Sequence, residues 1–225
     1  MAAPQHLTDQ DRAEIAAAIA AAERGTSGEV FCILAPSTSD YLETPLALAA
    51  AAALLAPPLA LFAGFDPAAF ATGGWQAGHA GGGIAFGAYA IAQAALFAVV
   101  GLVTAWRPLR FALTPSWLKA ARVRRAAQAH FISTGLAFAD DRTGVLIFAA
   151  LGEHRVEIMA DKLIHDAVGP EPWRLAAAAL AEGMKSADPS KGFVRAIEIC
   201  GGALARHFPA TGTETNDFPD QIVEI

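Results

Sequence analysis

A cysteine and an arginine near the C-terminus have the spacing of a phosphate-binding loop. Cys200 and Arg206 match the pattern C-x5-R, in which backbone N–H groups and an arginine hold a phosphate around a thiolate. Residues 192–207, however, have the period of a helix, with Phe193, Ile197 and Cys200 on one face. Because a helix cannot form such a loop, we predict that Cys200 is a small buried core thiol.

Four carboxylates are candidates for a metal-binding site. Asp140 and Asp141 precede a predicted strand and could join Glu29 or Asp161 around a hard cation such as Ca²⁺, which takes several oxygen ligands. The twelve-residue calcium loop with alternating Asp or Asn is absent from the sequence. The alternative is that these are solvated carboxylates in turns. We keep these four residues as weak candidates for a metal site.

Other catalytic signatures are missing from the sequence. The six histidines form no HExxH pattern and lie near no cysteine pair. There is no phosphate-binding Walker sequence and no G-x-S-x-G nucleophile elbow. We therefore assign no catalytic or cofactor-binding residue and expect no cofactor.

The centre of the N-terminal half is almost free of charge. Between Thr44 and Arg107 the only charged side chain is Asp66, which separates two long apolar segments. About 20 apolar residues cross a bilayer, so we predict a transmembrane hairpin with spans at about 45–65 and 83–106. Two Ala-rich core helices of a soluble bundle are the alternative, but neither segment has the polar face of such a helix. An ion channel or transporter is disfavoured, because two spans without intramembrane charge provide no ion path.

Lysine and arginine counts give the expected orientation. The connecting loop 66–80 contains neither residue, whereas the segment after Trp106 contains five arginines and one lysine: Arg107, Arg110, Lys119, Arg122, Arg124 and Arg125. The positive-inside rule then places both termini at the cytoplasmic face of the plasma (inner) membrane, and arginines there suit anionic headgroups. Positions 1–44 carry a polar helix instead of a signal peptide.

The flanking segments predict one α/β domain interrupted by the hairpin. The expected strands are 29–35, 144–151 and 155–159, and the expected helices are 7–24, 115–134, 162–168, 171–185 and 192–207. The first strand needs the other two as partners, so both flanks must share a compartment. The predicted parts are thus residues 7–44 and 107–208 of the α/β domain, the hairpin 45–106, and a polar C-terminal tail 209–225.

Composition limits the classes of function. The chain has 225 residues, a net charge of −6, 54% hydrophobic and 17% charged residues. The acidic balance argues against nucleic acid as a partner, and two cysteines suit a reducing compartment.

An ordered series of short motifs resembles the TPM domain family. The motifs are Thr26–Val30, Asp141–Phe148, Arg155–Ile158 with Asp161, Asp188–Gly192, and His207–Pro209 with Asn216–Asp220. The resemblance implies an αβα sandwich with a small central sheet. It also implies an accessory role at a membrane, or the acid phosphatase activity attributed to some members. This sequence differs from many members in lacking a signal peptide and carrying an internal hairpin.

We expect a membrane-anchored TPM-like protein that acts as a non-enzymatic binding or accessory module at the cytoplasmic face. Its partners would be the lipid bilayer and a membrane or cytoplasmic protein. A phosphatase, possibly metal-dependent, is the alternative.

Overall fold

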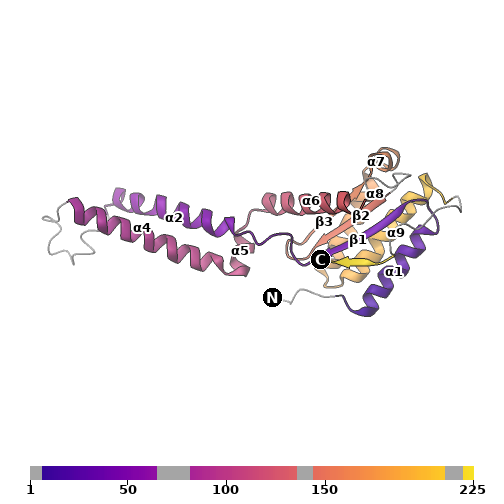
Figure 1. Cartoon of the computed structure of the whole chain (residues 1–225), viewed down its shortest axis with the longest axis horizontal. Coiled ribbons are helices and arrows are strands. Elements are labelled where there is room, and N and C mark those ends of the chain that lie inside the picture. Colours follow the sequence, from indigo (N-terminus) through magenta and orange to yellow (C-terminus); the bar gives the residue numbers. More distant parts are fainter. Residues whose placement is uncertain (1–6, 65–81, 136–143, 211–219) are drawn as a thin grey trace. The chain divides into compact units, whose positions relative to one another are not determined.

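The computed structural model describes residues 7–64, 82–135, 144–210 and 220–225 (Figure 1). The chain forms two compact units. The α/β unit consists of Met1–Ser39 and Ser116–Ile225, and the hairpin unit is Asp40–Pro115. The hairpin unit is therefore wider than the predicted hairpin at 45–106. In the described residues the fold is mixed α/β, with eight helices and a four-stranded sheet.

The sheet of the α/β unit is built around two buried parallel strands. β1 (Glu29–Ala35) and β2 (Gly144–Ala150) pair in parallel from Glu29 opposite Gly144 to Ala35 opposite Ala150. Their continuous apolar runs suit strands covered on both faces. β3 (Arg155–Ala160) pairs antiparallel with β2. The predicted partnership of these three strands is confirmed, so the chain leaves the sheet after β1 and returns to it after the hairpin unit.

The C-terminal tail, which was predicted to be a polar loop, contains a short strand of the sheet. β4 (Ile222–Glu224) pairs in parallel with β1, which gives the sheet order β3-β2-β1-β4 (Figure 1). Ile222 is buried, and Glu224 forms an ion pair of 2.8 Å with Arg12. A strand of three residues is too short for an alternating pattern to identify it in the sequence.

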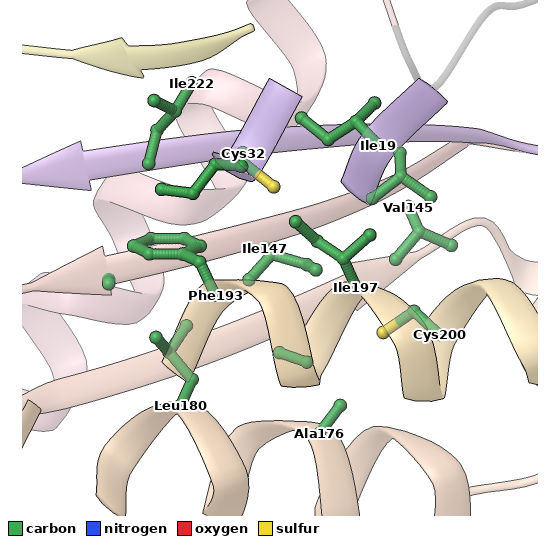
Figure 2. Close-up of a cluster of buried hydrophobic side chains, with 14 of the residues drawn as sticks. Ile19, Cys32, Val145, Ile147, Ala176, Leu180, Phe193, Ile197, Cys200 and Ile222 are labelled. Atoms are coloured by element: carbon green, nitrogen blue, oxygen red, sulfur yellow. The ribbon is translucent and has the colours of Figure 1, made fainter. Parts of the chain in front are cut away.

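Helices cover both faces of this sheet. α1 (Asp9–Glu23), α8 (Glu171–Lys185) and α9 (Pro189–His207) pack with the short α7 (Lys162–Val168) in the core on one face. α6 (Ser116–Ser133) packs on the other face through Val123 and Ala127. Alternate residues of β1 and β2 supply the two cores, so Cys32 and Ile147 face α9 (Figure 2).

Local signals place the helix ends close to their predicted positions. Thr8 caps α1, because its hydroxyl accepts from the Asp11 N–H at 3.2 Å while the Asp11 carboxylate accepts from the Thr8 N–H at 2.8 Å. α9 begins at Pro189, three residues earlier than predicted. There the Asp188 carboxylate accepts from the Lys191 N–H at 3.2 Å, and proline suits the first helical turn.

The hairpin unit consists of two long helices and one short one. α2 (Glu43–Phe62) continues through Pro57 and Pro58, and it packs against α4 (Gly82–Ala105). The two helices approach closely, since a Cβ atom on Gly101 would lie 3.6 Å from the Ala49 Cβ. α5 (Arg107–Leu113) follows α4 directly and packs on both long helices.

Candidate membrane-binding surface

Two helices of the described chain, α2 and α4, are long and apolar enough to cross a bilayer. α4 alone has 24 residues, which at ~1.5 Å per residue is about 36 Å, enough for a hydrocarbon core of about 30 Å.

The large side chains of these helices point outward. We define the apolar belt as the large apolar residues of α2 and α4 that are more than half exposed: Leu46, Leu54, Leu55, Leu59, Phe62, Phe86, Ile91, Val99, Leu102 and Val103. Residues that are buried between the helices are small, such as Ala49 and Ala53. A soluble core helix has the opposite arrangement, because it buries its large apolar side chains.

One end of the apolar belt carries an aromatic and basic boundary. Trp106 follows α4 and is exposed, as is Arg107 next to it. An interfacial tryptophan followed by arginine is typical of the edge of a bilayer.

Buried polar contacts hold together the base of the hairpin unit, where α2 begins and α5 ends. The Thr114 hydroxyl donates to the Arg110 carbonyl at 2.8 Å. It therefore accepts from the Thr44 hydroxyl, with 3.0 Å between the two oxygens. The Tyr41 ring packs edge-on against Phe111 at a centroid distance of 5.2 Å. These contacts fix α5 to the start of α2.

The metal candidates are only partly covered by the structure. Asp140 and Asp141 lie outside the described residues. Glu29 opens β1, and the Asp161 carboxylate caps α7 by accepting from the Leu163 N–H at 2.9 Å. Both lie at the same end of the sheet, since Gly144 is opposite Glu29 and its carbonyl accepts from the Asp161 N–H. Among the described residues, no three His, Cys, Asp or Glu side chains gather as a metal site would require.

A carboxyl group that the sequence analysis did not identify lies near the start of β1. The Glu23 carboxylate accepts from the Val30 N–H at 3.0 Å. The pKa of Glu23 is raised to about 8, mainly by burial and in addition by the neighbouring carboxylates of Glu29 and Asp220, while the hydrogen bond from Val30 acts in the opposite direction. The signal available in the sequence was an acidic residue in the last turn of a helix, where a basic one is usual.

The C-x5-R match forms no phosphate loop. Cys200 lies inside α9 and faces the core, as predicted (Figure 2). Burial raises the pKa of the Cys200 thiol to about 12, which keeps it protonated at neutral pH. The Arg206 Nε–H donates to the Gly202 carbonyl of the same helix at 2.9 Å.

Comparisons with known proteins give a fold but no family. No protein-family model matches the chain, and no curated protein matches it. The fold is similar to the NMR structure of the BA42 protein from the psychrophilic bacterium Bizionia argentinensis. That similarity covers 98% of this chain and 97% of the other, with a TM-score of 0.57 and 18% sequence identity. At this identity the likeness concerns the fold alone.

Proposed function

We propose that this protein is a membrane-anchored, TPM-like module without catalytic activity, held at the cytoplasmic face of the inner membrane by two spans. In this proposal the α/β unit is a TPM-like sandwich that binds another membrane or cytoplasmic protein. The observation that carries the anchoring role is the apolar belt. Exposing so many large apolar side chains to water is unfavourable, at about 25 cal/mol per Å² of apolar surface.

Strand pairing supports two crossings of the bilayer. β1 and β2 lie before and after the hairpin unit and are neighbours in one sheet. An even number of spans returns the chain to the compartment that it left. The basic residues that follow α4 favour the cytoplasmic side for both flanks.

The phosphatase alternative has weaker support. Its thiolate route requires an accessible, ionised cysteine, whereas Cys200 is buried with a raised pKa. A metal-dependent route through Asp140 and Asp141 stays a prediction. It would be favoured by phosphate release that Asp141→Asn abolishes while the fold survives.

A charge placed on the apolar belt tests the anchoring role. Ile91, in the middle of α4, is 71% exposed, and Leu163 of α7 is 54% exposed. A lysine at the centre of a span costs about 2.5–3.5 kcal/mol on insertion. We therefore expect Ile91→Lys to lower the carbonate-resistant membrane fraction and Leu163→Lys to leave it unchanged. If the hairpin unit were surrounded by water, Ile91→Lys would have no such effect.

A further inference from the structure

Arg110 is a buried cation at the base of the hairpin unit. Its side chain belongs to α5 and the residue is 6% exposed. Its Nε–H has no acceptor in the structure. Among the described residues, no ion pair involves Arg110.

An arginine in this situation needs an anion. A guanidinium keeps its proton at every physiological pH, so it cannot escape burial by becoming neutral as a lysine can. Removing an unpaired charge from water is strongly unfavourable, and buried charges in proteins are therefore paired. The described part of the hairpin unit contains the carboxylates of Asp40 and Glu43, and neither forms an ion pair with Arg110.

The position of Arg110 indicates the source of that anion. α5 follows Trp106 at the end of the apolar helix α4, where the headgroups lie if α4 spans the bilayer. The Thr114 and Thr44 hydroxyls tie the Arg110 backbone to α2, so the side chain is carried by a fixed turn. The fork of N–H donors on a guanidinium matches the oxygens of a phosphate.

We propose that Arg110 binds the phosphate of a net-anionic phospholipid headgroup at the base of the hairpin unit. This inference rests on the proposed membrane anchoring. It adds a lipid preference that insertion of the apolar belt alone would not produce. Anionic lipids give the cytoplasmic leaflet its negative surface potential, which suits this site.

The test compares Arg110 with Arg107, which carries the same charge on the same helix but is exposed. Full-length protein in dodecyl maltoside is mixed with phosphatidylglycerol, phosphatidylcholine or inorganic phosphate, and bound lipid is counted by native mass spectrometry. We expect the wild type and Arg107→Gln to retain phosphatidylglycerol over phosphatidylcholine. Arg110→Gln should bind it about tenfold more weakly or worse, as loss of a charge-assisted hydrogen bond predicts. Arg110→Lys, which keeps the charge without the fork, should lie between them.

Thermal unfolding separates a ligand-binding role from a structural one. Without lipid, Arg110→Gln should be at least as stable as the wild type, because it removes an uncompensated charge. Phosphatidylglycerol should then raise the melting temperature of the wild type and of Arg107→Gln, but not that of Arg110→Gln. If Arg110→Gln lowered stability equally with and without lipid, or bound phosphatidylglycerol like Arg107→Gln, the proposal would be overturned. If inorganic phosphate alone bound and stabilised the wild type through Arg110, a soluble anion would replace the lipid as the ligand.

Flotation with phosphatidylcholine vesicles distinguishes the two proposals. Wild type that fails to float contradicts the anchoring role itself. Wild type and Arg110→Gln that both float, with no preference for phosphatidylglycerol in either, contradict only the headgroup site.

Discussion

Thr44 at the start of α2 and Thr114 after α5 are joined by a hydrogen bond of 3.0 Å across 70 positions of the sequence. Both residues are buried, and the Thr114 hydroxyl donates a hydrogen bond to the Arg110 carbonyl at 2.8 Å. This chain of hydrogen bonds closes the base of the hairpin unit. It connects the beginning of one apolar helix to the short helix that follows the other.

Thr114→Val is expected to lower the free energy of unfolding by about 1–2 kcal/mol, because it leaves the Thr44 hydroxyl buried without its acceptor. Thr104→Val is the matched control. Thr104 is also buried, but its hydroxyl donates at 2.6 Å to the Val100 carbonyl within α4. A double-mutant cycle of Thr44→Val and Thr114→Val in detergent should show coupling. Strictly additive effects would contradict the hydrogen bond.

Two adjacent glycines of α9 should respond oppositely to alanine. A Cβ atom on Gly201 would lie 2.5 Å from the Ala22 Cβ and 3.2 Å from its Cα, whereas one on Gly202 would meet nothing within 4 Å. We expect Gly201→Ala to destabilise the α/β unit by about 1–3 kcal/mol through overpacking. Gly202→Ala should stabilise it by about 0.5–1 kcal/mol through helix propensity. Chemical denaturation measures both, and equal effects would contradict the close approach of α1 to α9.

Glu23 should make stability depend on pH. Its pKa is about 8 when folded, against an ordinary value of 4.5. Between these values the folded chain holds a proton that the unfolded chain has lost, so the free energy of unfolding falls as pH rises from 4.5 to about 8. Glu23→Gln should flatten this decline and raise stability above pH 8.

Glu171→Gln is the control for this pH dependence. The hydrogen bond from Arg174 lowers the pKa of Glu171 below its ordinary value of 4.5. The contribution of Glu171 to the free energy of unfolding is therefore lost only as the pH falls below about 4.5. Glu171→Gln should therefore leave the decline above pH 5 unchanged. A Glu23→Gln protein with the wild-type decline would show that Glu23 is not the group responsible.

Both cysteines should be inert in the folded protein. Cys32 and Cys200 are free and buried, and burial raises the pKa of each thiol. We expect neither to react with a thiol-specific disulfide reagent until the chain is denatured, when both should react. Rapid reaction of one thiol in the native protein, together with phosphate release that is lost in Cys200→Ser, would contradict this expectation and favour a phosphate-binding loop at Cys200.

The elements that could be predicted from the sequence are those whose pattern lies within one continuous stretch of residues. The apolar runs of β1 and β2, the Thr8 cap and the uncharged segments of the hairpin are all visible in a short window of residues. β4 was not visible, because three residues become a strand only beside β1.

The burial of single charged groups could not be predicted either. Charge counting places Arg110 among the basic residues that follow α4, and only the packing of α5 on α2 and α4 removes it from solvent. Glu23 likewise meets Glu29 and Asp220 only after the sheet forms. The burial of both groups depends on contacts between distant parts of the chain, and the local sequence pattern does not indicate such contacts.

The most direct test of the account is the side of the membrane on which each part of the chain lies. The buried native cysteines give a low background for labelling with a membrane-impermeant maleimide. A cysteine at Thr72, between the two spans, should be labelled in intact spheroplasts, whereas one at the exposed Ser186 of the α/β unit should be labelled only after the membrane is opened. Equal labelling of both positions in intact spheroplasts, or labelling of Ser186→Cys alone, would contradict a two-span anchor with the α/β unit in the cytoplasm.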